Sequence, residues 1–342
     1  MKAVRFHETG GPEKLVYEEA PRPTIREDEV LVRVRACALN HLDIYARSGS
    51  RKLDLPMPHI SGSDIAGEIH ETGKLAQGHA PGEKVLVAPG LSCGVCEYCT
   101  NGWDSLCSSY KIIGYQTQGG YAEYVAVPRE NILPIPDKLG FEETASVPLV
   151  FLTAWHMLVT RAHLRPGETV LVWAAGSGVG SAAIQVSRLL GAKVITTVGS
   201  DEKMKKAKEL GAESVINHHT QDVPDEVKRA TNGSKVNVVF DHIGAATWEK
   251  SMRSMAPGGR LVNCGVTSGG KTEVDIRYVF TRQFSLLGSY MGGRAELVNV
   301  LKFFEDGRLR PVVDSIFPLE EAGKAQARME QSSHFGKIVL KV

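Results

Sequence analysis

The stretch Thr169–Ser181 reads TVLVWAAGSGVGS and joins a β-branched apolar run to a loop of small residues. The apolar run is typical of a buried strand, and the stretch from Ser181 to Leu190 has a helical pattern. Small residues let a backbone approach a pyrophosphate closely, and the N–H groups and dipole of a helix N-terminus offset its charge. The stretch therefore predicts a dinucleotide-binding loop between a strand and a helix.

This loop fits the G-x-G-x-x-G fingerprint of such sites in two registers. The run 176–178 matches its beginning, with Ser181 in the place of the last glycine. In the other register Gly178 and Gly180 are the last two glycines, and small residues replace the earlier ones: Ala175 and Ser177. The expected dinucleotide contacts occupy four successive positions: Gly176, Ser177, Gly178 and Val179.

Around this loop, residues 151–290 alternate between strand and helix patterns. Such alternation with short connections predicts right-handed βαβ units and a doubly wound parallel sheet, an α/β fold. The expected strands are 169–173, 194–198, 214–216, 236–240, 261–264 and 284–288, and the expected helices include 181–190 and 201–210.

Residues 1–150 have a different character, because short alternating strands are separated by Gly and Pro. Examples are the runs 30–34, 84–87 and 121–125. The segment 291–342 returns to mixed patterns and ends in the strand-like run Lys337–Lys341, which we expect to rejoin the first domain. The chain is therefore expected to form a domain of residues 1–150, a dinucleotide-binding domain of residues 151–290 and a C-terminal return.

The end of the second strand, Val198-Gly199-Ser200-Asp201, bears on the choice of dinucleotide. Enzymes specific for NAD usually carry Asp or Glu there for the ribose 2′-hydroxyl, whereas this chain has Gly199. Ser200 and Lys203 are expected to bind a 2′-phosphate, with a charge-assisted bond of roughly 1.5–3 kcal/mol. Asp201 does not fit this scheme, and Ser200 alternatively caps the helix that follows. The pattern favours NADP(H) over NAD(H).

A second motif lies in the first domain, where four of the six cysteines form C-x2-C-x2-C-x7-C: Cys93, Cys96, Cys99 and Cys107. Four thiolates fill a tetrahedral zinc site and leave no position for a substrate, so we expect one structural zinc per chain, in a lobe at about 90–110. An iron–sulfur cluster is a competing interpretation, but its usual motif continues as x3-C-P. A disulfide framework is disfavoured, because no export signal precedes the first strand. Cys37 and Cys264 are expected to be buried small side chains.

Composition limits the partners of the chain. The 342 residues carry a net charge of +1, from 40 basic and 39 acidic side chains without a block of one sign. This balance argues against nucleic-acid binding, and no apolar run reaches the roughly 20 residues of a membrane span. We therefore expect a cytoplasmic globular protein that acts on a small molecule.

The motifs together resemble the medium-chain dehydrogenase/reductase superfamily along the full length. The matches include the cysteine motif and the runs Gly119–Tyr124, Thr153–Trp155 and Asp241–Gly244. The resemblance implies a β-rich GroES-like catalytic domain built from both chain ends, with a Rossmann domain inserted after about residue 150. It also implies a set of cofactor-binding residues beyond the glycine loop: His41, Thr153, Ser200, Lys203, His218 and Gly265.

The zinc alcohol dehydrogenases of this superfamily bind a catalytic zinc through three ligand positions. A Cys comes from a G-x-C-H-x-D segment, a His from a G-H-E segment, and the third ligand shortly before the Thr of the cofactor domain. In this chain those positions hold Asn40, Ser63 and Leu149, which do not form a zinc site. A relocated metal would have to use other residues: Cys37, His41 or His59.

The same segments resemble the zinc-free quinone oxidoreductases and ζ-crystallin-like enone reductases. Their Asn and Tyr beside the nicotinamide correspond to Asn40 and Tyr45, which are our candidate catalytic hydrogen-bond donors. Both also have structural interpretations, a turn cap for Asn40 and core packing for Tyr45. His41 is expected near the cofactor phosphates and Asp43 in support of the local fold. Those zinc-free enzymes generally lack the four-cysteine lobe.

The resulting hypothesis is NADPH-dependent reduction of a quinone or α,β-unsaturated carbonyl without a catalytic metal. The alternatives are an alcohol dehydrogenase and an NADPH-binding protein with little turnover. Phe280 and Met291 are candidate substrate-pocket residues. Relatives commonly pair through the last Rossmann strand, here near 284–288, so a homo-oligomer, a dimer or a tetramer, is expected.

Overall fold

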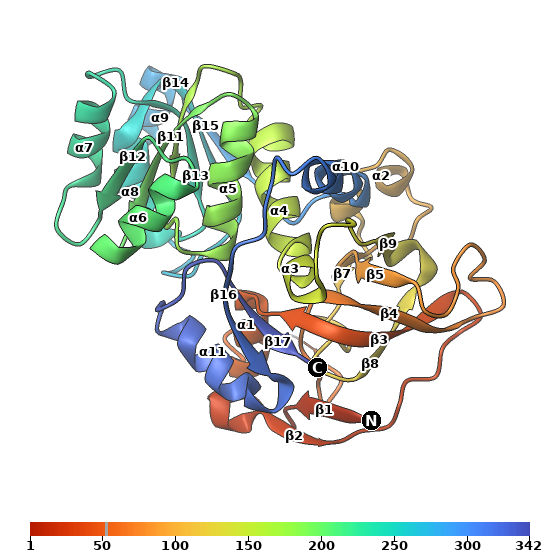
Figure 1. The fold of residues 1–342 in the computed structure, drawn as a ribbon. Helices are drawn as coiled ribbons and strands as arrows, with labels where there is room; N and C mark the ends of the chain where they lie inside the picture. Colours follow the sequence, from red (N-terminus) through yellow and green to blue (C-terminus); the bar gives the residue numbers. More distant parts are fainter. Residues whose placement is uncertain (52–53) are drawn as a thin grey trace. The chain divides into compact units, whose positions relative to one another are not determined.

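A computed structural model describes residues 1–51 and 54–342 (Figure 1). The chain forms two compact units. The first unit combines Met1–Leu149 with Gly293–Val342, and the second unit is the continuous segment Val150–Gly292. Both chain ends therefore belong to the same unit, and the second is an insertion into the first.

The second unit is built on a six-stranded sheet in which every neighbouring pair is parallel. The strand order is β12-β11-β10-β13-β14-β15. From one edge to the other the strands are Ser214–Asn217, Lys193–Val198, Thr169–Val172, Val236–Asp241, Met255–Asn263 and Ser285–Gly288. Parallel strands covered on both faces need apolar residues at nearly every position, which explains the continuous β-branched runs of the sequence. The Rossmann-like fold is confirmed.

Five helices connect these strands: α5 (Gly178–Leu189), α6 (Asp201–Glu209), α7 (Val223–Ala230), α8 (Ala245–Ser254) and α9 (Ile276–Arg282). The loop from β10 into α5 lies next to the ends of β11 and β13, because β10 pairs with both. In a doubly wound sheet this is the place where the strand order reverses and a crevice opens for a ligand. The observed topology therefore supplies a ligand site at the glycine loop.

The first unit contains a seven-stranded, mainly antiparallel sheet. Its order is β16-β17-β3-β4-β5-β9, and β8 also pairs with β3. In that order the strands are Val313–Pro318, Lys337–Lys341, Glu29–Ala38, Asp64–Thr72, Lys84–Val87 and Ile132–Pro134, with β8 at Tyr124–Pro128. The last strand of the chain, β17, pairs directly with β3. This pairing brings the C-terminus beside residues near position 38, a contact that connects the two ends of the sequence.

The expected strand 121–125 is shifted in the structure, where β8 begins only at Tyr124. Tyr121 and Ala122 lie before it, and Ala122 forms an isolated bridge with Ala3. Both side chains are completely buried. The apolar pattern thus identified buried residues correctly, but tertiary packing moved the ladder by a few positions.

Smaller elements complete the first unit. Two short sheets pair β1 (Lys2–Arg5) with β2 (Val16–Glu19) and β6 (Gly90–Leu91) with β7 (Lys111–Ile112). Its helices are α1 (His41–Ser48), α2 (Glu97–Thr100), α3 (Phe141–Ala145), α10 (Arg294–Glu305) and α11 (Ala322–Glu330), and α4 (Pro148–Trp155) begins where the unit ends. Within the described part of the chain, no helix has the length and apolar character needed to cross a membrane.

Candidate functional site

The glycine loop is organised by Ser177, the N-cap of α5. Its hydroxyl accepts a hydrogen bond from the Gly180 N–H at 2.9 Å and donates one to the Ala174 carbonyl at 2.9 Å. Gly180 packs so closely that an added Cβ would lie 2.2 Å from the Ala174 oxygen. A side chain at position 180 is therefore excluded, and the close-packing glycine of the fingerprint is Gly180, not Ser181. Of the two registers left open by the sequence, the structure selects the second.

Further residues of the second unit surround this loop. His242 Nε2 lies 3.2 Å from Ser177 Oγ and 3.0 Å from the Trp173 carbonyl. Gly265 approaches the same histidine, because a Cβ there would lie 2.5 Å from the His242 oxygen. The glycine loop, His242 and Gly265 thus form one group at the ends of β10, β13 and β14. We did not select His242 from the sequence, although its place directly after a predicted strand was a usable signal.

The end of β11 presents a cluster of basic side chains. The rings of His218 and His219 are tilted by 54° with centroids 4.4 Å apart, and they flank Gly199, whose added Cβ would lie 3.1 Å from His219 Nε2. Burial lowers the pKa of His218, and the positive charges of His219, Lys250 and Lys203 lower it further. These groups come from different parts of the chain, so the tertiary fold gathers them around His218.

Ser200 and Asp201 differ from the simplest sequence interpretation. Ser200 stands at the N-cap of α6 but makes no side-chain cap hydrogen bond. Asp201, which conflicted with a phosphate site, accepts a hydrogen bond from Asn217 Nδ2 at 3.0 Å. Its carboxylate is therefore engaged by β12. This bond accounts for an acidic residue beside the basic cluster.

The second unit has features that fit a dinucleotide. The N-terminus of α5 offers backbone N–H groups at Gly178 and Val179, which are only half-buried. Thr153, in α4, is 6% exposed, and its buried hydroxyl makes no hydrogen bond to any described residue. A buried hydroxyl without a partner is costly, so it is a natural contact for a bound ligand. Phe280 is exposed on α9, and Met291 is buried.

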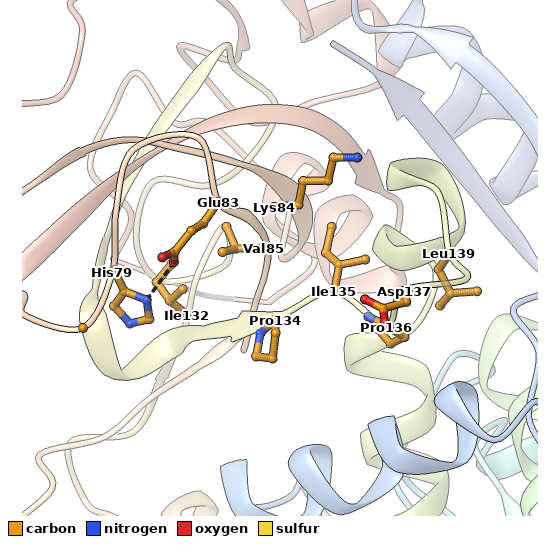
Figure 2. A pocket seen from close by; sticks show the side chains of 11 residues that line it. His79, Glu83, Lys84, Val85, Ile132, Pro134, Ile135, Pro136, Asp137 and Leu139 are labelled. Atoms are coloured by element: carbon orange, nitrogen blue, oxygen red, sulfur yellow. Dashed lines mark ion pairs between the residues drawn. The ribbon is translucent and has the colours of Figure 1, made fainter.

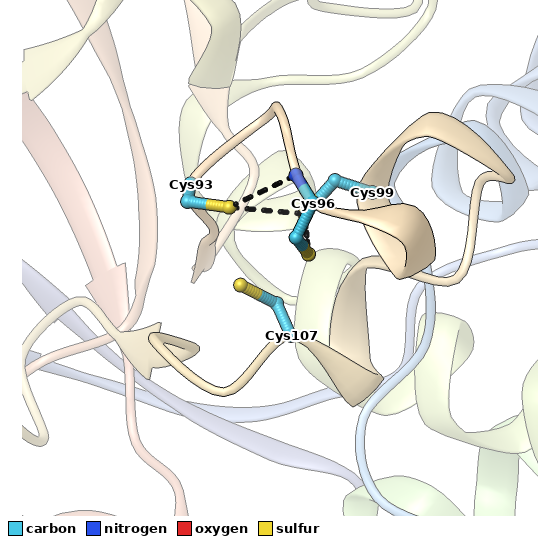
Figure 3. Close-up of side chains that lie close together, drawn as sticks. All are labelled: Cys93, Cys96, Cys99 and Cys107. Carbon is cyan, nitrogen blue, oxygen red and sulfur yellow. Dashed lines mark hydrogen bonds between the residues drawn. The ribbon is translucent and has the colours of Figure 1, made fainter.

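In the first unit the four cysteine sulfurs converge on one point (Figure 3). All four lie within 4.8 Å of one another. The Cys93 and Cys96 sulfurs lie 3.9 and 3.5 Å from that of Cys99. A tetrahedral zinc with bonds of about 2.3 Å separates its sulfurs by about 3.8 Å, and a disulfide needs about 2.05 Å. The geometry therefore fits a four-thiolate metal site and not disulfides.

The chemistry of this site also fits a metal. Hydrogen bonds from the Val95 and Cys96 N–H groups lower the pKa of the Cys93 thiol to about 6. These bonds stabilise the Cys93 thiolate, which is the form that binds zinc. Although a backbone bond at Cys99 opposes the rise, the pKa of Cys96 is instead raised to about 11 by the neighbouring Cys99 thiol and by burial. The lobe otherwise has little regular structure: the short pair β6–β7, the one-turn helix α2 and a 3-10 turn at Asp104–Leu106. A metal would supply the cross-links that this segment lacks.

Asn40, the first candidate catalytic residue, is held in a buried ionic network. Its Oδ1 accepts a hydrogen bond from Lys337 Nζ at 2.7 Å, and its Nδ2 donates one to Asp64 Oδ2 at 2.9 Å. Lys337 Nζ also donates to Asp64 Oδ2 at 2.8 Å and to the Leu39 carbonyl at 2.6 Å. We call Leu39, Asn40, Asp64 and Lys337 the Lys337 cluster. Sequence reasoning missed its two charged members.

The three positions that the family resemblance assigns to a catalytic zinc lie at or beside this cluster. Asn40 is part of it, and the Leu149 N–H donates to Asp64 Oδ1 at 2.8 Å. Ser63 precedes Asp64, is completely buried, and its hydroxyl has no partner among the described residues. The structure thus assembles the metal-site positions but fills them with an amide, a hydroxyl and a leucine.

A relocated metal site does not appear in the described part of the chain. There, the cysteine quartet is the one group of three or more His, Cys, Asp or Glu side chains close enough to share an ion. Cys37 is buried, and burial strongly raises its thiol pKa. His59 is also buried and lies 3.3 Å from the Gly114 carbonyl through Nε2. His41 is exposed at the start of α1.

Asp43 is a second buried carboxylate near Asn40. It accepts hydrogen bonds from the Asn40 N–H at 2.8 Å, the Tyr121 hydroxyl at 3.0 Å and the Gly62 N–H at 3.1 Å. Burial raises the pKa of Asp43 to about 6, although these donors oppose the rise. The carboxylate fixes the first turn of α1, as expected of a residue that supports the local fold.

Tyr45, the second candidate catalytic residue, lies on the same face of α1 as His41. Their ring centroids are 6.3 Å apart, and the Arg51 guanidinium lies 4.6 Å from the Tyr45 ring centroid. Tyr45 is half-buried. The structure therefore brings Tyr45, His41 and Arg51 together, while Asn40 precedes them at the buried end of the helix.

A separate cavity of about 540 Å³ lies elsewhere in the first unit (Figure 2). His79 Nδ1 and the Glu83 carboxylate form an ion pair of 3.5 Å at one side of it. The other lining residues are Gly78, Lys84, Val85, Ile132, Pro134, Ile135, Pro136, Asp137 and Leu139. None of these described residues belongs to the sites above, so this cavity is distinct from them.

Comparison with known proteins gives two family matches. Residues 26–137 match the alcohol dehydrogenase GroES-like domain, and residues 178–306 match the zinc-binding dehydrogenase family. An alcohol dehydrogenase of Geobacillus stearothermophilus is 33% identical, with 100% of both chains covered. The quinone oxidoreductase of Homo sapiens is 28% identical over 99% of this chain and 97% of its own. A crystal structure of an NAD-dependent alcohol dehydrogenase is 46% identical, with a TM-score of 0.97 and 100% of both chains covered.

Proposed function

This chain belongs to the medium-chain dehydrogenase/reductase superfamily and is an oxidoreductase that uses a pyridine nucleotide, and from that premise we propose that it reduces quinones or α,β-unsaturated carbonyl compounds with NADPH. The observation that carries this proposal is the Lys337 cluster. A catalytic zinc needs thiolate, carboxylate or imidazole ligands. In this cluster an ammonium group is bonded to the amide of Asn40 and to Asp64. The proposed reaction therefore proceeds without a catalytic metal.

The chemistry matches these residues. NADPH, when bound, supplies a hydride to the β-carbon of the substrate. The electron pair of the double bond moves to the carbonyl oxygen, so the active site must stabilise an enolate. Hydrogen-bond donors do this, and in this proposal they are the Asn40 amide and the Tyr45 hydroxyl. A proton from Tyr45 or water then completes the reduction.

Reduction of an isolated carbonyl would make a heavier demand. An alkoxide concentrates its charge on one oxygen, and a metal usually supplies several kcal/mol of stabilisation there. Each 1.36 kcal/mol of lost stabilisation costs a factor of ten in rate. A site with neutral donors is therefore better matched to a conjugated acceptor, whose charge is delocalised.

The preference for NADPH rests on the surroundings of Gly199. Three features favour a 2′-phosphate there. Gly199 has no side chain, the Ser200 hydroxyl makes no cap hydrogen bond to α6, and basic groups lie nearby. Replacement of Lys203 by Ala should weaken NADPH binding at least about tenfold, because a charge-assisted bond contributes roughly 1.5–3 kcal/mol. NADH binding should change less than about twofold, as should both affinities in the control Lys206→Ala on the same helix. Equal weakening for both nucleotides would contradict the NADPH preference.

Two further parts of the proposal concern the lobe and the assembly. Cys93, Cys96, Cys99 and Cys107 hold one structural zinc per chain.

A homo-oligomer forms along the edge strand β15, where Leu286 is 38% exposed in an apolar strand. An exposed apolar edge invites pairing with another copy. Size measurement of wild type and a Leu286→Lys variant tests this, and an unchanged mass in the variant would contradict the interface.

Alcohol dehydrogenase activity is the second candidate, because relatives at 33% and 46% identity bear that name. A zinc determination and a substrate panel distinguish the two candidates. We expect one zinc per chain and NADPH-dependent reduction of 1,4-naphthoquinone or trans-2-hexenal. Two zincs with oxidation of simple alcohols would replace the proposal with the second candidate. Tight NADPH binding without turnover would indicate a binding protein.

A further inference from the structure

We propose that Lys337 is a positioning residue, whose buried ammonium holds and polarises the Asn40 carboxamide so that one amide N–H remains for the substrate oxygen. This inference rests on the proposed function. It adds a residue from the last strand of the chain, distant in sequence from every motif of the reaction. Lys337 and Asn40 are 297 positions apart and are joined only because β17 pairs with β3.

Hydrogen-bond chemistry fixes the orientation of the amide. An ammonium group only donates hydrogen bonds, and an ionised carboxylate only accepts them. The amide oxygen of Asn40 must therefore face Lys337, and its nitrogen must face Asp64, at 2.7 and 2.9 Å. A flipped amide would place its NH₂ against the ammonium and its oxygen against the carboxylate. Asn40 consequently has a single stable orientation.

The same bonds leave one donor uncommitted. The Asn40 amide has two N–H bonds, and Asp64 receives one of them. The other has no acceptor among the described residues. Asn40 is buried but is not wholly inaccessible, since 6% of the residue is exposed. One N–H of known orientation is what an enolate-stabilising group requires.

Lys337 itself has no hydrogen-bonding capacity to spare. Its three donors go to the Leu39 carbonyl, Asn40 Oδ1 and Asp64 Oδ2. The side chains of Lys337 and Asp64 are 4% and 0% exposed, so their charges are compensated inside the protein. A saturated ammonium does not act as an acid or contact substrate, and its effect must pass through Asn40.

Polarisation adds to the positioning effect. A positive charge on the amide oxygen draws electron density from the nitrogen and makes the remaining N–H a stronger donor. Hydrogen bonds in chains of this kind strengthen one another in a low-dielectric interior. The ammonium thereby contributes to stabilising a negative charge that it does not touch.

The test compares Lys337→Met with Lys341→Met, a control in the same strand whose lysine is exposed. With NADPH and 1,4-naphthoquinone or trans-2-hexenal, kcat of Lys337→Met should fall roughly 10–100-fold. Loss of a residue that orients a functional group typically lowers activity by such a factor. The NADPH dissociation constant should change less than twofold, because the glycine loop belongs to the other unit. Lys341→Met should match wild type in both measurements.

A double-mutant cycle separates positioning from general structural support. Asn40→Ala should lower kcat, and adding Lys337→Met to it should lower kcat by less than about threefold more, because Lys337 acts through Asn40. Full multiplication of the two effects would overturn the proposal. So would a Lys337→Met protein that unfolds at lower temperature but keeps wild-type kcat.

Chemical rescue covers the case in which Lys337→Met does not fold. Lys337→Ala leaves space for a small amine, and methylammonium should restore kcat several-fold, whereas tetramethylammonium, which has no N–H donor, should not. Equal effects of both salts would contradict the proposal, as would failure of the Ala variant to fold even with methylammonium.

A wild type inactive with both substrates overturns the proposed function itself, whereas an active wild type with an unaffected variant overturns only the role of Lys337.

Discussion

The four-cysteine lobe (residues 90–112) and the Lys337 cluster are both sites at which ligand-type atoms converge in the first unit. In the lobe, four sulfurs from one short segment lie within 4.8 Å of one another, close enough to share one metal ion. In the Lys337 cluster, oxygens from β4 and the start of α1 surround an ammonium supplied by the chain itself. The comparison teaches that the lobe gathers four potential metal ligands and no cation of its own, whereas the Lys337 cluster contains a cation from the chain itself.

The difference also appears in burial. Cys93 is exposed, Cys96 and Cys99 are partly exposed and only Cys107 is buried, whereas Asp64 and Lys337 are almost completely buried. An exposed lobe with little core gains stability from a metal. A buried charge pair is instead sensitive to the loss of either partner.

The largest effect is expected from Cys93→Ser, which removes one ligand of the lobe. Zinc should fall from one equivalent to none, because three thiolates do not close the site. Amide hydrogen exchange of residues 93–107 should accelerate by roughly 10³-fold as the lobe opens. Mass spectrometry under native conditions and hydrogen exchange measure both. Cys264→Ser is the control, and zinc retention in Cys93→Ser would place the metal elsewhere.

Asp64→Asn should produce the next largest effect, on the other side of the comparison. It leaves the Lys337 ammonium buried without a counter-ion, which costs about 3–5 kcal/mol of unfolding free energy. The matched control is Glu68→Gln on the same strand, which breaks an ion pair with Arg35 of 2.7 Å that is partly exposed. That change should cost less than about 1 kcal/mol. If urea unfolding shows similar losses of unfolding free energy for Asp64→Asn and Glu68→Gln, burial does not make the Lys337 cluster more sensitive than a surface ion pair.

Asp43 gives a pH dependence beside the cluster. Its pKa is raised from 3.8 to about 6 in the folded protein, so folding favours the protonated carboxyl. This contribution is complete below pH about 4 and is lost as pH rises through about 6, a change of up to about 3 kcal/mol. Unfolding free energies of wild type and Asp43→Asn should therefore diverge between pH 4 and 6. Parallel pH profiles would contradict the shifted pKa.

The smallest effect should be on catalysis after removal of the metal. A four-thiolate site has no open position, so zinc contributes to structure and not to the reaction. Chelator-treated protein that remains folded at low temperature should keep kcat within about threefold of the untreated protein. If turnover is lost while circular dichroism shows that the protein remains folded, the zinc contributes to the reaction and the prediction is wrong.

Sequence patterns predicted the features that lie within short segments. The glycine loop, the cysteine spacing and the parallel α/β sheet each depend on residues close together in the chain. Their physics is local, because a strand–loop–helix unit or a metal loop is specified by neighbouring residues. The family and the fold class were therefore accessible before any coordinates.

Other features depended on contacts between distant segments. Asp201 looked unfavourable for a phosphate site until Asn217 was found bonded to it. Tyr121 and His242 belonged to recognised motifs, but their partners Asp43 and Ser177 could not be assigned from spacing. Hydrogen-bond partners across a fold are set by strand pairing and loop packing, which a single sequence does not state.

The sequence by itself determined that this chain has a dinucleotide loop, a four-thiol motif and no ligand set at the usual catalytic-zinc positions. Only the tertiary structure decided which glycine packs against the strand and which charged side chains surround Asn40. Lys337 opens a short apolar strand, where a lysine is ordinarily solvated. It becomes an internal cation because β17 pairs with β3 and delivers its ammonium to Asn40 and Asp64. No local sequence pattern predicts the contact between Lys337 and Asn40, because the two residues are separated by almost the whole chain.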